Sequence, residues 1–142
     1  MRVVLDSNIL VRAFMRKAGP ANQALIATLS ETLILSNEIL HEVTRVLRYP
    51  RMLQIHEQSE EEVYGFVESL RGAAIVIPLD VAGLSPIRDS NDVFVVQTAT
   101  RGDADVLCTR DRDFFSPPAS TFLANCGIAV MTDIQLIQRL RE

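Results

Sequence analysis

The sequence lacks several features that would assign it to a broad class. No apolar run approaches the roughly 20 residues of a transmembrane helix, and the opening segment MRVVLDSNIL reaches a carboxylate too early for a signal-peptide core. We therefore expect a cytoplasmic protein with no membrane segment. The two cysteines, Cys108 and Cys126, suit reduced, buried thiols better than a disulfide framework. There is a single lysine, Lys17.

The sequence also lacks a positive charge excess. Its formal net charge is −4, whereas a protein that coats nucleic acid through charge alone would be basic. High-affinity, nonspecific nucleic-acid binding is therefore disfavoured. A nuclease whose own site is acidic, and which reaches phosphate through a bound metal ion, remains compatible with this charge.

Length and composition indicate one globular domain over residues 1–142. Hydrophobic residues make up 48% of the chain and charged residues 23%, and we find no repeat and no low-complexity linker. Short apolar runs alternate with segments of helical periodicity. The expected strands are 2–5, 32–35, 73–77, 105–108 and 128–131, and the expected helices are 8–16, 21–30, 37–48 (ended by Pro50), 59–72, about 90–102 and 133–140.

This alternation predicts an α/β fold with a central parallel sheet of about five strands covered by helices on both faces. Capping-box spacing marks two helix starts, at Ser59 with Glu62 and at Thr132 with Gln135. In such sheets ligands bind outside the carboxyl ends of the strands, at a topological switch point. The residues that follow the strands are therefore the first candidates for a site.

Carboxylates follow two of the expected strands. Asp6 comes directly after the apolar run VVL, and Asp111 and Asp113 follow the run DVLC in the segment CTRDRDFF. Asp6 could instead be only the N-cap of the helix that follows it. Asp111 and Asp113 could be ordinary turn residues.

Another carboxylate falls on the apolar face of a helix. In NEILHEVTRVLR, Glu42 lies three residues after Ile39 and four before Val46, within the stripe that Val43 and Leu47 complete. A carboxylate that faces a core is costly unless it is paired or binds metal. The alternatives are an ion pair with Arg45 or a side chain that turns to solvent at the edge of the stripe.

The helix in NDVFVVQTATRG repeats this pattern. Asp92 shares a face with Val95, Val96 and Ala99. An aspartate in a first turn can also serve as a cap and complement the helix dipole, so both interpretations stay open. Asp89 is a nearby and more loop-like competitor.

Four carboxylates gathered without a counterion would repel one another. A hard cation such as Mg²⁺ or Mn²⁺ resolves the repulsion, because it prefers oxygen ligands and keeps water molecules for chemistry. Metal-bound water is a better nucleophile, and metal ions stabilise the transition state of phosphodiester hydrolysis.

The ordered set of motifs resembles the PIN-domain ribonucleases over nearly the whole chain, most closely the branch that includes toxins of type II toxin–antitoxin pairs. The motifs are the segment around Asp6, Ser7 and Asn8, then SNEILHEVTRVL, RDSNDVFVVQTA and TRDRDFF. The resemblance implies a three-layer PIN-like fold and a metal-dependent endoribonuclease that cuts single-stranded RNA. It also implies an antitoxin partner that holds the enzyme inactive, and a homodimer.

The resemblance also implies roles for individual residues. The catalytic and metal-binding set carries over as Asp6, Glu42, Asp92 and Asp111, with Asp113 as an auxiliary ligand, Asn8 and Thr109 as supporting residues, and Asp89 able to share or replace the role of Asp92. Ser7 stands where the family more often has threonine, and it keeps the hydroxyl.

Two other functions compete with this one. Aspartyl-phosphate proteins need a lysine beside the phosphoryl group, but Lys17 lies in the first helical region, and Asn8 stands where the phosphatases have a second aspartate. A non-catalytic PIN-like module that binds RNA or protein would be expected to lack an acidic residue, and none of the four is missing. His41 and His56 are expected to be structural or exposed, because the proposed metal prefers oxygen.

Arginines near the expected site are candidates for RNA contacts. Arg45 and Arg48 lie one turn apart on the helix that carries Glu42, and Arg110 and Arg112 flank Asp111. The alternative is a solvated surface without a binding role.

Overall fold

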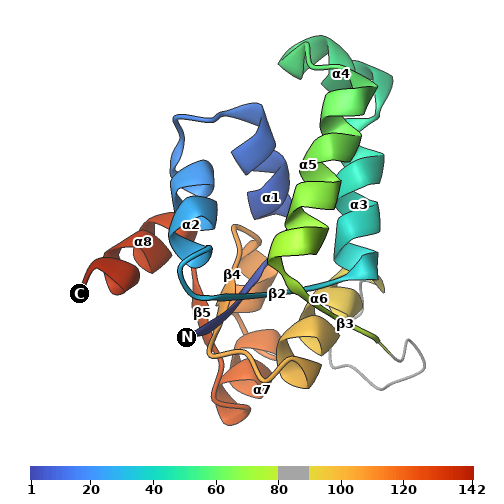
Figure 1. Ribbon diagram of the computed structural model, residues 1–142. Helices are drawn as coiled ribbons and strands as arrows, with labels where there is room; N and C mark the ends of the chain where they lie inside the picture. Colours follow the sequence, from blue (N-terminus) through green and yellow to red (C-terminus); the bar gives the residue numbers. More distant parts are fainter. Residues whose placement is uncertain (80–89) are drawn as a thin grey trace.

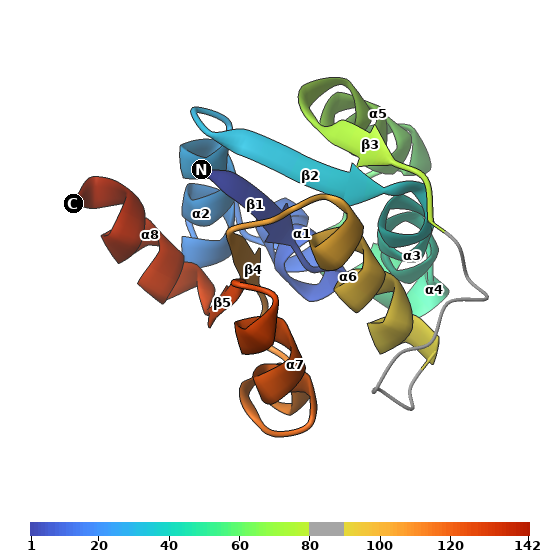
Figure 2. The ribbon, with the colours of Figure 1, turned by 90° about the horizontal axis from the view of Figure 1, so that it is seen from below.

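The computed structural model describes residues 1–79 and 93–142 in full and the backbone alone of residues 90–92. Its parallel sheet has the strand order β3-β2-β1-β4-β5 in the described residues, with helices on both faces (Figures 1 and 2). The predicted α/β fold with five strands is confirmed. The strands are β1 (Arg2–Leu5), β2 (Thr32–Ser36), β3 (Ile75–Ile77), β4 (Val106–Cys108) and β5 (Ala129–Met131).

The helices agree with the predicted ones within a few residues, and the structure adds three short ones. The helices are α1 (Ser7–Met15), α2 (Pro20–Thr28), α3 (Asn37–Leu47), α4 (Pro50–His56), α5 (Glu60–Ala73), α6 (Ser90–Arg101), the 3₁₀ helix η1 (Arg112–Phe115), α7 (Ala119–Asn125) and α8 (Asp133–Arg141). The three additions are α4, η1 and α7. Pro50 does follow the end of α3, but it also begins α4, where proline is tolerated at the first helical position.

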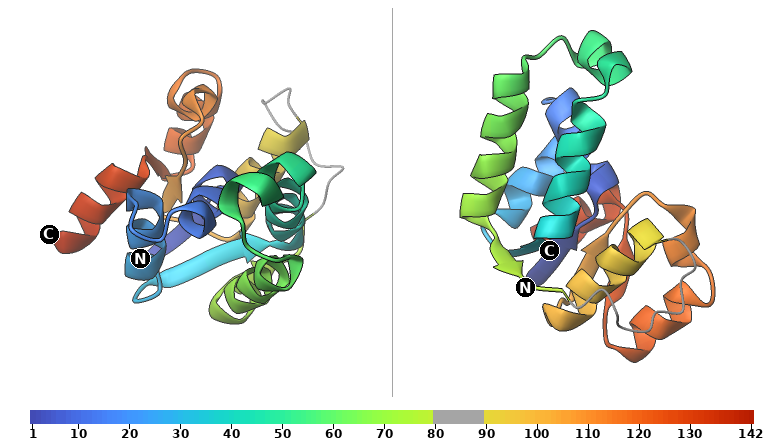
Figure 3. Two further views of the ribbon diagram at one scale, coloured as in Figure 1. Left: turned by 90° about the horizontal axis from the view of Figure 1, so that it is seen from above. Right: turned by 90° about the vertical axis from the view of Figure 1, so that its right-hand side faces the viewer.

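The helices form a layer on each face of the sheet. On one face lie α1, α2, α3 and α5, with α4 at the far end of the α3–α5 pair, and on the other lie α6 and α7 (Figures 2 and 3). The final helix α8 packs against α2 beside the β5 edge (Figure 2). Val3, Val4 and Leu5 are fully buried between the layers, which explains why β1 is continuously apolar.

The strand order places a topological switch point beside β1. The chain proceeds from β1 through β2 to β3 on one side, and then returns to place β4 and β5 on the other. In the register of β1 with β4, Leu5 pairs with Cys108, so both strands end at the same level. The next residues, Asp6 and Thr109, therefore emerge side by side at the carboxyl edge of the sheet.

Both predicted capping boxes are present. The Ser59 hydroxyl accepts from the Glu62 amide at the start of α5, and the Thr132 hydroxyl accepts from the Gln135 amide at the start of α8. In each box the side chain of the third helical residue, Glu62 or Gln135, accepts a hydrogen bond from the backbone amide of the cap residue.

The two cysteines are both free thiols, in agreement with the sequence, but they differ in burial. Cys108 is buried in β4, and Cys126 is exposed after α7, so the expectation of two buried thiols is wrong for Cys126. The helix that Cys126 follows, α7, is one of the three that the sequence did not predict. Within the described residues no helix has the length and apolarity that crossing a membrane requires.

Gly102, at the end of α6, allows this helix to approach β2 closely. A Cβ atom built at Gly102 would lie 2.5 Å from Ile34 Cγ2 and 2.8 Å from the Thr98 carbonyl oxygen, whereas one at Gly65 in α5 meets nothing within 4 Å. We expect Gly102→Ala to lower the free energy of unfolding by about 1–3 kcal/mol through overpacking. Gly65→Ala should raise it by about 0.5–1 kcal/mol through helix propensity. Urea unfolding of both variants checks this, and equal effects would contradict the close approach.

Candidate active site

Asp6 lies at the switch point, where β1 passes into α1. It is the N-cap of α1, and its side chain is only 4% exposed. Its Oδ1 accepts from the Ser7 amide at 2.6 Å. Its Oδ2 accepts from the Thr109 hydroxyl at 2.7 Å and from Asn8 Nδ2 at 3.2 Å. This one carboxylate therefore both caps α1 and forms part of a buried polar site.

Thr109 connects this carboxylate to the loop that follows β4. Its side chain is fully buried, and its Oγ1 donates to Asp6 and accepts from the Asp111 amide at 3.0 Å. Asn8 Nδ2 also lies 3.4 Å from Thr109 Oγ1. The structure thus brings together Asp6, Asn8 and Thr109, three of the residues named from the sequence.

The surroundings of Asp6 make its carboxylate difficult to ionise. Burial raises the pKa of Asp6 from its usual value of 3.8 to about 6, and the nearby charge of Glu42 acts in the same direction. Hydrogen bonds from Thr109 and Ser7 oppose the rise, but they only partly offset the loss of hydration. The Glu42 contribution shows that α3 presents a second negative charge to the same region.

Glu42 occupies the edge of the buried face of α3 rather than its centre. The predicted stripe is confirmed for Ile39, Val43 and Leu47, which are buried. Its buried face also includes Leu40, whereas Glu42 and Val46 are half-buried. Arg45 donates to the Tyr49 hydroxyl, and within the described residues no hydrogen bond or ion pair joins it to Glu42. The half-buried carboxylate is thus not explained by the proposed pair with Arg45.

Glu38 is a carboxylate that the sequence analysis did not single out. It lies one helical turn before Glu42, and its Oε2 atom is buried with no hydrogen-bond partner among the described residues. The i, i+4 spacing of Glu38 and Glu42 was the available signal. Its position in the first turn of α3 resembles an ordinary helix-dipole interaction and concealed it.

Asp111 behaves in part as the turn residue that the sequence allowed. It is the half-buried N-cap of η1, and its Oδ1 accepts from the Asp113 amide at 3.0 Å. Asp113 itself is exposed. The second carboxylate oxygen of Asp111 has no hydrogen bond to any described residue. In the loop after β4, Asp111 is therefore tied to Thr109 by a hydrogen bond, whereas Asp113 stays at the surface.

Asp92 lies in the first turn of α6, but its side chain and the whole of Asp89 fall outside the described residues. The choice between them as a third ligand stays a prediction. The three apolar residues predicted to share the Asp92 face, Val95, Val96 and Ala99, are buried. The inward orientation predicted for this face of the helix is thus confirmed beyond its first turn.

Carboxylate oxygens are the ligands that Mg²⁺ and Mn²⁺ prefer, so the residue types at this edge of the sheet suit such an ion. The mutual repulsion of Asp6 and Glu42 is a further observation that favours a cation between them. In the described part of the chain, however, no three side chains of the His, Cys, Asp and Glu types are close enough to form a metal-binding group.

The candidate RNA-binding arginines on α3 are engaged in contacts at the surface. Arg48 pairs with Glu60 at 3.3 Å and lies over the ring of Tyr64. Arg45 lies over the ring of Tyr49, to whose hydroxyl it donates. These contacts hold both guanidinium groups on the outer side of α3.

The two arginines that flank Asp111 differ from each other. Arg110 pairs with Asp133 at the start of α8, through Nε at 2.8 Å and a terminal nitrogen at 2.7 Å. Arg112 is exposed, and among the described residues its side chain has no hydrogen-bond or ion-pair partner. Asp133 was not identified from the sequence, because it carries only the ordinary signal of an acidic residue in a first helical turn.

Comparisons with known proteins agree with this fold. A family model described as a PIN domain matches residues 2–113. The structure is similar to a chain of VapBC2 from Rickettsia felis, which was solved bound to a DNA fragment from their promoter. The TM-score is 0.60 at 16% identity, over 93% of this chain and 98% of the other. A search of the curated proteins found no match.

The raised pKa of Asp6 predicts a pH-dependent stability in buffer without divalent cations. Because the folded state binds this proton more tightly, the stabilisation is present below pH 3.8 and is lost as the pH rises through about 6. Between pH 4 and pH 7 the wild type should lose roughly 2 kcal/mol relative to Asp6→Asn. Urea unfolding of both proteins at several pH values measures this. A difference that does not change with pH would contradict the burial of an ionisable Asp6.

Proposed function

The chain belongs to the PIN-domain family, and on this premise we propose that it is a metal-dependent endoribonuclease that hydrolyses phosphodiester bonds of single-stranded RNA. The observation that carries the proposal is the buried carboxylate of Asp6 at the switch point, whose pKa is raised by burial and by Glu42. The fold alone does not require an ionisable group at this position, whereas a site that exchanges a proton for a metal ion does require one.

We propose that Asp6, Glu42, Asp92 and Asp111 hold Mg²⁺ or Mn²⁺, with Asp113 as an auxiliary ligand from the surface of the loop. When bound, the ion supplies an activated water molecule and stabilises negative charge on the phosphodiester. Asp6 and Asp111 are supported in this role by their common contact to Thr109, which spans the ends of β1 and β4. Asp89 remains the alternative to Asp92.

The residues around Asp6 fix the direction of its carboxylate. The Ser7 amide holds Oδ1, while Thr109 and Asn8 hold Oδ2. Oδ1 also accepts from the Ser7 hydroxyl at 3.3 Å, so each oxygen accepts two bonds, and a bound ion would take the place of one of the longer contacts. Such second contacts orient a metal ligand before the ion arrives, which lowers the cost of binding it.

We further propose that the protein is the toxin of a toxin–antitoxin pair and binds an antitoxin protein. The support is the fold similarity to the VapBC2 chain. A homodimer is proposed on the family resemblance, with the apolar helices predicted at 21–30 and 59–72 as its candidate surface. In the structure Ile26 and Leu29 are 58% and 52% exposed at the first of these.

Cleavage of a mixed set of single-stranded RNAs tests the enzymatic proposal. The purified protein, shown to be free of copurified antitoxin, should cut with Mn²⁺ and stop with EDTA. Glu42→Gln and Asp6→Asn should each lower the rate by about 100-fold or more, since each removes a proposed ligand. Glu61→Gln is the matched control, because Glu61 is an exposed carboxylate on α5, and it should leave the rate unchanged.

Two outcomes would contradict the enzymatic proposal. Cutting that survives EDTA would remove the metal from the reaction. A folded wild type that binds RNA without cutting it would favour the alternative, a non-catalytic PIN-like module that binds RNA or protein.

We propose that Arg45, Arg48, Arg110 and Arg112 contact the RNA backbone. Arg112 is the most direct test, because it is exposed beside Asp111 and has no partner among the described residues. In the Asp6→Asn background, which should bind without cutting, Arg112→Gln should weaken RNA binding and reduce the slope of log affinity against log salt by about 0.7. Arg141→Gln, at the distant end of α8, should leave the slope unchanged, and equal slopes for all three proteins would exclude Arg112.

A further inference from the structure

We propose that Asp133, at the start of α8 and outside the predicted carboxylate cluster, is a positioning residue that fixes the loop after β4 by holding Arg110. This loop carries Thr109 and Asp111. The inference rests on the proposed function in so far as these two residues serve the site, but the link between α8 and the loop is a property of the fold itself.

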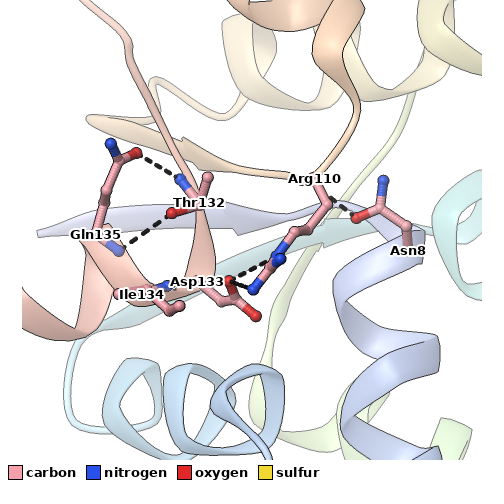
Figure 4. Close-up of polar contacts among 6 residues, drawn as sticks. All are labelled: Asn8, Arg110, Thr132, Asp133, Ile134 and Gln135. Atoms are coloured by element: carbon pink, nitrogen blue, oxygen red, sulfur yellow. Dashed lines mark hydrogen bonds and ion pairs between the residues drawn. The ribbon is translucent and has the colours of Figure 1, made fainter.

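The contacts of Asp133 converge on one oxygen atom. Its Oδ1 accepts from Nε and from a terminal nitrogen of Arg110, at 2.8 and 2.7 Å, and from the Ile134 amide at 3.0 Å (Figure 4). The Asp133 side chain is 1% exposed, and that of Arg110 is 34% exposed. RNA therefore cannot reach Asp133, and a direct role in binding substrate is excluded.

Helix capping does not account for this buried charge. Thr132 and Gln135 already form a complete capping box at the start of α8, with bonds of 3.2 and 2.9 Å (Figure 4). A buried carboxylate costs stability unless it is paired and hydrogen-bonded. Its strongest partner is Arg110, 23 residues earlier in the chain, so the pair joins two separate elements.

Arg110 is held at both ends. Its guanidinium group binds Asp133, while its backbone amide donates to Asn8 Oδ1 at 3.3 Å (Figure 4). The side-chain nitrogen Nδ2 of the same Asn8 donates to Asp6 Oδ2 at 3.2 Å. A continuous series of polar contacts therefore runs from α8 through the loop to the buried carboxylate at the end of β1.

Release of the guanidinium group should loosen the loop on the side that Asn8 does not hold. The Asp111 amide, which donates to Thr109, and the Asp113 amide, which donates to Asp111, depend on the loop keeping its shape. Partners of this kind, beyond the ligands themselves, affect metal affinity by about 10–100-fold. A role of Arg110 in binding RNA alone would change RNA affinity instead.

Amide hydrogen exchange and Mn²⁺ binding of the full chain, compared in two variants, test the proposal. Asp133→Asn removes the charge that holds Arg110, and we expect the amides of Arg110, Asp111 and Asp113 to exchange about tenfold faster. Mn²⁺ affinity, measured by calorimetry without RNA, should fall by about tenfold. Thr132→Ala is the matched control, since it removes the cap of the same helix without touching Arg110. It should lower the melting temperature while loop exchange and Mn²⁺ affinity stay at wild-type values.

A second variant keeps the test decisive if Asp133→Asn does not fold. Arg110→Lys retains the positive charge but offers one nitrogen where arginine offers two, and its effects on loop exchange and on Mn²⁺ affinity should be intermediate. Wild-type exchange in both foldable variants, or equal acceleration in Thr132→Ala, would overturn the proposal. If the wild type binds no Mn²⁺, the proposed function fails, and the exchange rates still decide whether Asp133 fixes the loop.

Discussion

The carboxylate of Asp6 is buried at the end of the central strand, and this burial constrains most of what surrounds it. An ionisable group with 4% exposure requires donors that replace water. Ser7 and Asn8 of α1 supply some of them, and Thr109, directly after the neighbouring strand β4, supplies another. These donors do not fully compensate, so the pKa stays near 6. A cation at the site would offset the remaining cost of burying the charged carboxylate.

The topology explains why these groups meet. In the sheet, β2 and β3 lie on one side of β1, and β4 lies on the other. Residues 6 and 109 are therefore neighbours, although about a hundred positions separate them in the sequence. The loop after β4 then has to be held in place, and α8 supplies the contact through Asp133. This edge of the sheet is thus built by elements from the two ends of the chain, and Figure 4 shows Asn8 of α1 and Asp133 of α8 both in contact with Arg110.

The parts of the structure that were predictable from the sequence are those set by local pattern. Continuous apolar runs gave the strands, and the spacing of Ser59 with Glu62 and of Thr132 with Gln135 gave two helix starts. The position of Asp6 after an apolar run pointed to the switch point. The helices α4 and α7 have seven residues each, too few to show a clear period, and Pro50 reads equally well as an end or a beginning.

The parts that were not predictable depend on contacts between distant residues. The pairing of Arg110 with Asp133 has no local signal, so Arg110 was interpreted either as an RNA contact or as a solvated surface residue. The edge position of Glu42, rather than a central one, follows from how α3 packs on its neighbours, which shifts the buried face toward Leu40. The buried oxygen of Glu38, which has no hydrogen-bond partner in the described part of the chain, likewise appears only when the helices are assembled.

The most direct measurement is an NMR titration of the Asp6 carboxyl carbon, with and without Mg²⁺. If this carboxylate exchanges a proton for a cation, its pKa should lie near 6 in metal-free protein and fall markedly when Mg²⁺ is present, because the ion stabilises the charged form. A pKa near 3.8 in metal-free protein, or a raised pKa that Mg²⁺ does not change, would contradict the account.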